Sequence, residues 1–189
     1  MGTVGLLLGS GWASGINLYL VTLLLGIASR LGWGEVPEIF GRTEFVVLAA
    51  ILAGIEFVAD KIPYVDNVWD SIHTVLRPLG AAVIGALLTG ETTSLVTAVG
   101  AVVSGGLALN AHAAKASTRI AVNASPEPVS NVVLSVAEDL LVAGLMTLAL
   151  MFPVLTTVVV FALVISAGAL TIWLFRRVRG AWRGVRTRV

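Results

Sequence analysis

The sequence has no cysteine among its 189 residues, and only 12% of the residues are charged. Without cysteine, the chain forms no disulfide and offers no thiolate ligand to a metal. A soluble domain carries about 25% charged residues, so this chain has too few to cover a surface in water. Hydrophobic residues make up 57% of the sequence, and the mean hydropathy is +0.97. This composition predicts an all-α protein embedded in a lipid bilayer.

A helix that spans a membrane needs roughly 20 mostly apolar residues. The stretches that provide such helices are Val4–Leu31, Glu44–Ile62, Leu79–Gly90 with an extension back to about Val75, Leu95–Val122 and Val132–Phe175. The last stretch is long enough for two helices, and Pro153 with Thr156-Thr157 marks the turn between them. The first stretch lacks the basic residues that open a secretory signal, so we expect it to be retained as a span. The sequence thus predicts six transmembrane helices.

Several short motifs recur along the chain at an offset of 89 or 90 positions. The matching pairs are Gly11 with Gly100, Ser14-Gly15 with Ser104-Gly105, Arg30 with Arg119, Pro37-Glu38 with Pro126-Glu127, and Pro63 with Pro153. Three helices in each copy would insert the second copy in the opposite sense, so we expect an inverted 3+3 repeat. Its copies would be residues 1–91 and 92–178, followed by a basic tail at 179–189. A bundle this small encloses little volume, which favours a homo-oligomer.

Basic residues gather at the end of the chain, where six of the twelve Lys and Arg residues follow Phe175. Because cytoplasmic segments carry an excess of Lys and Arg, we expect the C-terminus in the cytoplasm of a bacterium, with the protein in its inner (plasma) membrane. Six spans would place the N-terminus there as well. The tail would contact anionic membrane lipids. No nucleic acid is expected as a partner, because the tail has no folded binding module.

Ionisable residues inside the predicted spans form the main candidate site. Such residues usually face a cavity or one another, because a charge in the hydrocarbon is costly. Glu56, His112 and Glu138 each lie roughly 10 Å from the cytoplasmic end of a predicted helix. Further ionisable residues beside them are Asp60, Lys115, Arg119 and Asp139. We interpret this set as substrate- and proton-binding residues of a cavity open to the cytoplasm. An ion-pair network that only holds the helices together would explain the same pattern.

The first predicted span is rich in glycine, at Gly5, Gly9, Gly11 and Gly15. Small residues at this spacing let helices approach closely in lipid. The alternative is a helix broken near Gly9–Gly15, where freed backbone groups, Ser14 and Asn17 would line the cavity. The matching segment Gly100–Gly106 leaves the same two readings open.

A polar stripe lies between the second and third predicted spans, at Asp66, Asp70, His73 and Arg77. If Tyr64–Arg77 is helical, these residues share one face, which is typical of an amphipathic helix at the membrane surface. Two carboxylates and an imidazole on one face could also bind a divalent metal, so Asp66, Asp70 and His73 form an alternative metal site. No other cofactor is expected.

The run Glu56-Phe57-Val58-Ala59-Asp60-Lys61-Ile62-Pro63, followed by Asp66, Asp70 and Arg77-Pro78, resembles the bacterial integral-membrane family catalogued as domain-of-unknown-function family 4126. Further similar segments are Gly105–Leu109 with His112, Lys115 and Arg119, and Leu134-Ser135 with Glu138-Asp139. The resemblance covers nearly the whole chain and implies a membrane protein. It implies no particular activity.

These patterns favour a small secondary transporter or flippase-like carrier for an ion or a phosphate-bearing amphiphile. In one version Glu56 and Glu138 exchange protons, while His112, Lys115 and Arg119 attract an anionic group. Two other classes stay open, and an enzyme is the less favoured of them. One is a scaffold subunit of a membrane complex without catalytic activity. The other is an intramembrane metal-dependent enzyme that acts on a lipid.

Overall fold

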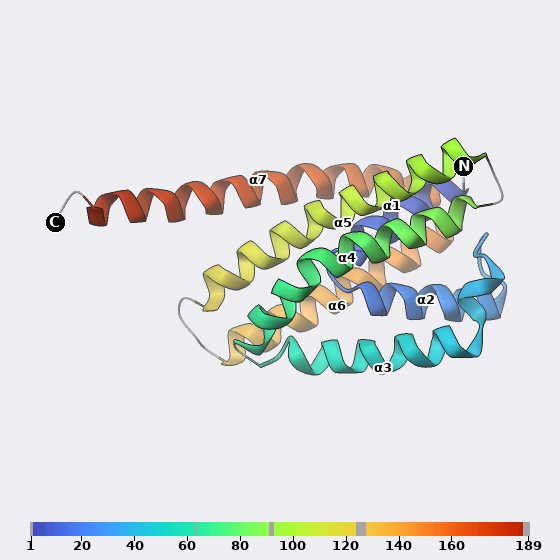
Figure 1. The fold of residues 1–189 in the computed structure, drawn as a ribbon, viewed down its shortest axis with the longest axis horizontal. Coiled ribbons are helices and arrows are strands. Elements are labelled where there is room, and N and C mark those ends of the chain that lie inside the picture. Colours follow the sequence, from blue (N-terminus) through green and yellow to red (C-terminus); the bar gives the residue numbers. More distant parts are fainter. Residues whose placement is uncertain (1, 63, 91–92, 124–127, 187–189) are drawn as a thin grey trace.

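The computed structural model describes residues 2–62, 64–90, 93–123 and 128–186, and in these residues all regular structure is helical (Figure 1). The elements are α1 (Gly2–Ser14), α2 (Leu18–Leu31), the short 3-10 helix η1 (Glu38–Gly41), α3 (Thr43–Ala59), α4 (Val65–Thr89), α5 (Ser94–Asn123), α6 (Pro128–Met151) and α7 (Pro153–Arg186). The predicted all-α class is confirmed.

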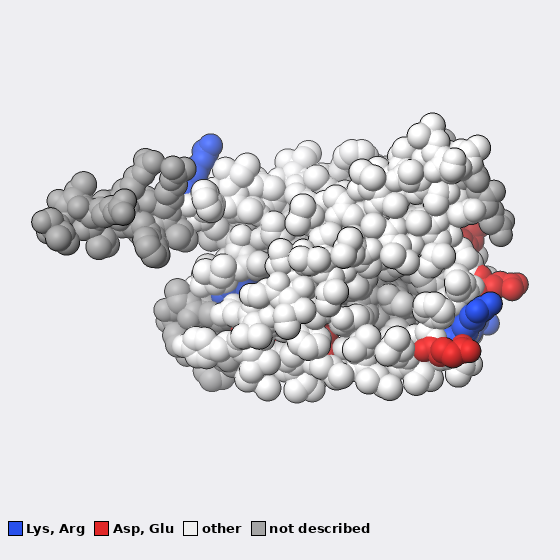
Figure 2. Space-filling view, in the orientation of Figure 1, with Lys and Arg blue, Asp and Glu red and all other residues white. Residues whose placement is uncertain are grey.

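Among the described residues, four helices are long and apolar enough to cross a membrane, judged by length and composition. The segments that meet this criterion are Val65–Thr89 of α4, Ser94–Val122 of α5, Val129–Met151 of α6 and Pro153–Arg177 of α7. The 17 residues of α3 make a helix of roughly 26 Å, which runs along the same bundle. Figure 2 shows a side of the bundle almost free of charged residues, as a lipid-facing surface requires.

The first predicted span is divided into two helices. α1 ends at Ser14, α2 begins at Leu18, and each is roughly 20 Å long, short of a bilayer of about 30 Å. The two helices run in opposite directions, since the Thr3 hydroxyl at the start of α1 donates to the Glu35 carboxylate beyond the end of α2 at 2.8 Å. α1 and α2 therefore form a hairpin whose tip lies inside the bundle (Figure 1).

Local chemistry at the tip explains the break. The Asn17 side chain caps α2 by accepting from the backbone N–H of Leu20 at 2.9 Å, which stabilises a new helix start. Gly15 lies so close to α5 that a Cβ there would overlap the Ala108 carbonyl. The first copy therefore shows both close packing at the glycines and a helix break after Ser14, whereas its counterpart Gly100–Gly106 lies within the unbroken helix α5.

Because the hairpin returns to the end at which it starts, the described residues do not confirm six full spans in an inverted 3+3 repeat. Helices α3 to α7 alternate in direction along the bundle, and the start of α1 and the end of α7 lie at its opposite ends (Figure 1). This arrangement differs from the predicted one, in which both termini share one side. Several predicted landmarks lie outside the described residues, which are Pro63, the boundary between the copies at 91–92, the Pro126-Glu127 match and the end of the tail at 187–189.

The expected surface helix over Tyr64–Arg77 is instead the first half of α4, which continues to Thr89. Its polar stripe faces inward, so that Asp66, Asp70, His73 and Arg77 are all buried. Its opposite face exposes large apolar side chains, among them Val68, Ile72 and Val75. The helix is amphipathic in the opposite sense to a helix of a soluble protein. Its apolar face points outward, where a membrane would supply lipid, and its polar face packs against the charged residues of neighbouring helices.

Close helix packing places α1 at the centre of the bundle, where it contacts α4, α5, α6 and α7. A Cβ at Gly11 would lie 2.9 Å from the Ser104 Cα, and a Cβ at Gly9 would lie 2.9 Å from both the Ala149 and Thr156 methyl groups. Only glycine permits these approaches, since a side chain would separate the backbones. The neighbouring helices therefore pack closely against α1, the first helix of the hairpin.

Candidate functional site

The buried charged side chains lie together near one end of the bundle, where α3 and α5 finish and α4 and α6 begin. We call this set the ionic network. Its fully buried members, each at most 8% exposed, are Glu56, Asp60, Asp66, Asp70, Arg77, Lys115, Arg119 and Glu138. Helical periodicity brings them inward, because residues three, four or seven positions apart share a face. The basic end of α7 points to the same end of the bundle (Figure 1).

Arg77 links three helices at the inner part of the network. One terminal nitrogen lies 2.5 Å from Glu56 Oε1, and the other lies 2.8 Å from Asp70 Oδ1. The second nitrogen also lies 2.7 Å from His112 Nδ1. A guanidinium only donates, so His112 Nδ1 must accept and the imidazole must be neutral with its hydrogen on Nε2. That Nε2 lies 3.0 Å from the Thr74 hydroxyl, which in turn donates to a backbone carbonyl.

Lys115 is the centre of the network. Its ammonium nitrogen lies 2.5 Å from Asp60 Oδ2 and 3.5 Å from Glu138 Oε2. Two more carboxylates lie slightly farther away, Asp70 at 3.8 Å and Glu56 at 4.0 Å. Carboxylates from α4, α6 and the C-terminal end of α3 therefore converge on one cation from α5.

Arg119 joins α5 to α6 at the outer part of the network. It lies 2.5 Å from Glu138 Oε2 and donates to Asn131 Oδ1 at 2.8 Å. It also donates to the backbone carbonyl of Asp60, which is free because α3 ends there. The carboxylates of Asp60 and Asp66 each lie 3.6 Å from it. Predicted residues from three helices thus meet here.

The tip of the α1–α2 hairpin touches the ionic network directly. Lys115 Nζ donates to the Ile16 carbonyl at 3.0 Å, Asn17 Nδ2 donates to Asp139 Oδ1 at 3.1 Å, and the Tyr19 hydroxyl lies 3.0 Å from His73 Nε2. The carbonyl of Ile16 is available because the helix is interrupted at this point. Hence the break in the chain and the buried charges are one structural unit.

The edge of the network between α3 and α6 is its most accessible part. Lys61 and Asp139 lie 4.0 Å apart, with side chains 20% and 18% exposed. Lys61 donates to Ser135 Oγ at 3.2 Å and to the Phe57 carbonyl at 2.9 Å. Lys61 follows the end of α3, and its partial burial lowers the pKa of its ammonium group, an effect that the carboxylate of Asp139 opposes.

The structure gives no support to the alternative metal site. His73 donates from Nδ1 to the Trp69 carbonyl at 2.8 Å, while Asp70 is paired with Arg77. The Trp69 ring stacks on His73 with centroids 4.6 Å apart. Within residues 2–62, 64–90, 93–123 and 128–186, no group of three or more His, Asp or Glu side chains is placed to hold a metal ion. The stripe serves the ionic network instead.

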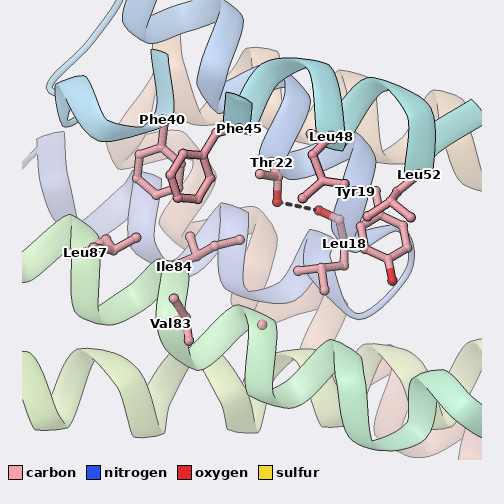
Figure 3. Close-up of a pocket in the computed structure, with 12 residues that line it drawn as sticks. Leu18, Tyr19, Thr22, Phe40, Phe45, Leu48, Leu52, Val83, Ile84 and Leu87 are labelled. Carbon is pink, nitrogen blue, oxygen red and sulfur yellow. Dashed lines mark hydrogen bonds between the residues drawn. The ribbon is translucent and has the colours of Figure 1, made fainter. Parts of the chain in front are cut away.

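Two apolar pockets flank α3 and reach the margin of the network. The first pocket, of about 260 Å³, lies between α2, η1, α3 and α4 (Figure 3). One of its lining residues is Tyr19, whose hydroxyl lies beside His73. The second, of about 340 Å³, lies between α2, α3 and α6 and has Asn17 and Asp139 as its polar lining residues. Both are lined mainly by apolar side chains, so they suit hydrocarbon chains better than water.

The structure brings together most of the predicted site residues. These are Glu56, Asp60, His112, Lys115, Arg119 and Glu138, with Asn17 and Asp139 at the margin. Ser14 does not join them, because its hydroxyl donates within α1 to the Ser10 carbonyl at 2.7 Å. Sequence reasoning placed Arg77 only in a surface stripe and missed Asn131 and Tyr19. Arg77 could have been found, since it lies seven positions after Asp70 on the same helical face.

Comparison with known proteins identifies a family. Residues 4–177 match the family model described as "Domain of unknown function (DUF4126)". The chain therefore belongs to this family, which confirms the resemblance seen in its motifs. No curated protein and no solved structure matches the chain. The function has to be argued from the site.

Proposed function

We propose that this member of the DUF4126 family is a small proton-coupled membrane carrier for an anion, either a small ion or a phosphate-bearing amphiphile. The observation that carries the proposal is the contact between the broken-helix tip and the network around Lys115. Charged residues inside a membrane commonly mark a transport pathway. Interrupted helices commonly supply backbone groups to a transporter's binding site near the middle of the bilayer.

Competition for the same cations supplies the coupling. The Glu138 carboxylate forms an ion pair with Arg119 at 2.5 Å and lies 3.5 Å from Lys115. An anionic substrate can bind these cations only if the carboxylate gives them up. Protonation of Glu138 removes its charge and frees the cations, whereas Arg119 keeps its own proton at any accessible pH. Each anion charge that binds is therefore accompanied by one proton.

The two ends of the network differ in a way that suits alternating access. On one side, the Lys61–Asp139 edge is partly exposed. On the other side, the α1–α2 hairpin covers the network through Ile16 and Tyr19. Movement of the hairpin tip would open the second side. For an amphiphile, the pocket of about 340 Å³ beside Asp139 would take part of the apolar chain.

The proposed topology places the basic end of α7 in the cytoplasm of a bacterium, in its inner membrane, with the hairpin entering from the opposite side. In this topology the duplication corresponds to an inverted repeat of two helices, α3–α4 and α6–α7. The helices of the first pair run in the opposite directions to their counterparts in the second pair (Figure 1). Pro63 and Pro153, the matching prolines, precede α4 and begin α7. The predicted homo-oligomer is part of the same proposal.

A purely structural network is the second candidate. The observation that favours it is Arg77, whose two terminal nitrogens are both bonded and whose side chain is fully buried. Such closed ion pairs can serve helix assembly alone. In that case the protein would be a scaffold subunit of a membrane complex.

Flux measurements in proteoliposomes distinguish the candidates. The full chain is reconstituted with a pH-sensitive dye inside, and either inorganic phosphate or a lysophospholipid with a phosphate headgroup is added outside. A carrier moves protons inward with one of these probes, faster at lower external pH. Glu138→Gln, which mimics the protonated acid, stops proton movement but retains anion exchange. Glu44→Gln, at the far end of α3, is the matched control and behaves as the wild type.

Absence of proton movement with both probes would overturn the carrier. The same conclusion follows if Glu56→Gln and Glu138→Gln both leave proton flux unchanged. Co-purification of other membrane subunits, combined with absence of flux, would favour the scaffold.

A further inference from the structure

The charges of the ionic network do not balance. In the described residues it contains six carboxyl groups, which are Glu56, Asp60, Asp66, Asp70, Glu138 and Asp139. It contains four basic side chains, which are Lys61, Arg77, Lys115 and Arg119. Full ionisation with neutral histidines leaves two negative charges without compensation in an apolar bundle. We infer that the network binds two exchangeable protons at neutral pH, one in each of two groups of side chains.

The first proton belongs to the group around Arg77. Arg77 makes the shortest ion pairs to two carboxyl groups, Glu56 and Asp70, which Lys115 approaches only to 4.0 and 3.8 Å. Their other oxygens, Glu56 Oε2 and Asp70 Oδ2, are buried and have no hydrogen-bond donor among the described side chains. His112 supplies no charge, because it accepts from Arg77. One proton on either of these two carboxyl groups makes this group neutral.

The second proton belongs to the group around Lys115 and Arg119. These two cations serve three carboxyl groups, Asp60, Glu138 and Asp66. Asp60 Oδ1 is buried and also lacks a donor within the described part of the chain. One proton on this group leaves two cations with two carboxylates. The outer pair of Lys61 and Asp139 is balanced by itself.

Histidine protonation does not remove the imbalance. His73 donates from Nδ1 to the Trp69 carbonyl, and Nε2 of the neutral ring can accept from the Tyr19 hydroxyl. Both histidines are therefore held by partners that suit the neutral ring. The compensating charges must come from outside the network.

Protons fit the site better than metal ions. Lys115 already occupies the centre of the carboxylates and would repel a second cation there. The described residues also offer no set of three acidic or imidazole ligands to a metal. A proton needs no such space, since it bonds to one carboxylate oxygen and converts the ion into a neutral acid. No other bond is made or broken.

This inference deepens the proposed function, because a carrier that exchanges protons needs groups that hold them at rest. It can be tested without transport. The full chain is placed in lipid nanodiscs at neutral pH, and the carbonyl stretching band of protonated carboxylic acids is measured by infrared spectroscopy. Labelling Asp or Glu with carbon-13 separates the two residue types, and deuterium exchange identifies exchangeable protons.

The expected result is two protonated carboxyl groups per chain. Glu56→Gln and Asp60→Asn should each remove one of them, because each variant restores charge balance in its own group. Glu44→Gln, outside the network, should remove none. The wild-type count remains decisive even if a network variant does not fold. A count of zero at neutral pH, or a count that neither variant lowers, would overturn the inference.

Repeating the measurement without sodium and potassium tests for a bound metal cation. The band should not change. If it grows when these ions are removed, metal ions rather than protons balance the network and the inference is wrong. Two protonated groups in a protein without proton flux would leave the inference standing and overturn the carrier. Proton flux without protonated groups would leave the carrier standing and overturn the inference.

Discussion

The ammonium group of Lys115 donates a hydrogen bond of 3.0 Å to the carbonyl oxygen of Ile16. The two residues are far apart in sequence, yet this bond joins the central cation of the ionic network to the interruption between α1 and α2. An unbroken first helix would use that carbonyl for its own hydrogen bonds. The broken helix and the buried cation therefore depend on each other, and several expectations follow from their contact.

Adding a methyl group at Gly15 should displace the hairpin tip. The Cβ would overlap the Ala108 carbonyl and lie 2.7 Å from the Ala111 methyl group. Gly15→Ala should lower stability by about 1–3 kcal/mol, as overpacking of a core does. The measurement is the thermal unfolding midpoint in mild detergent. Gly106→Ala is the control, because nothing lies within 4 Å of a Cβ there, and it should stabilise helix α5 by roughly 0.5–1 kcal/mol.

Removing a cation from the network should cost far more than removing a carboxylate. Arg77→Gln leaves Glu56 and Asp70 buried without their cation, which should destabilise the protein by about 3–5 kcal/mol. Glu56→Gln leaves Asp70 to pair with Arg77, so its cost should be much smaller. Unfolding of both variants in increasing SDS would compare them. Equal losses of stability would contradict the excess of carboxyl groups over cations.

Substitutions at Asn17 should separate its two roles. Asn17→Ala removes the cap of α2 and should cost about 0.5–2 kcal/mol at any pH. Asn17→Asp keeps an acceptor for the Leu20 N–H but places a second carboxyl group against Asp139. When both are ionised they repel each other, so this variant should lose stability as the pH rises. Unfolding midpoints across acidic to alkaline pH would show the difference, and a flat profile for Asn17→Asp would speak against the contact.

Chemical labelling should discriminate the two lysines of the chain. Lys61 is partly exposed and burial lowers the pKa of its ammonium group, so a larger share is the reactive free amine at a given pH. Lys115 is 3% exposed and should not react in the folded protein. Mass spectrometry after brief treatment with an amine-reactive ester would measure both. Asp139→Asn removes the opposing carboxylate and should accelerate labelling of Lys61. Labelling of Lys115 at a similar rate would contradict the closed network.

Much of the candidate site could be predicted from the sequence because depth along a helix is a local property. The fixed rise per residue placed Glu56, His112 and Glu138 at one level before any contact was known. All three then appear within one network. Partner choice could not be predicted in this way. Which carboxylate reaches Arg77 or Lys115 depends on how four helices are rotated against each other.

The polar stripe of α4 shows a second limit of local patterns. Its spacing correctly predicted that Asp66, Asp70, His73 and Arg77 share one face. The same pattern fits a helix on the membrane surface and a spanning helix with a charged inner face. Only the cations of α5 decide between them, because Lys115 and Arg119 supply the charges that compensate buried carboxylates.

Composition and periodicity alone determined that this chain is helical and suited to lipid, and that it carries charges within its apolar stretches, because these properties depend on neighbouring residues. The tertiary structure decided that the first apolar stretch turns back on itself at Gly15–Asn17. Hydropathy cannot distinguish one long helix from two short ones. The turn is favoured only when an asparagine caps the new helix, a glycine fits against α5, and a lysine from that same helix binds the freed carbonyl.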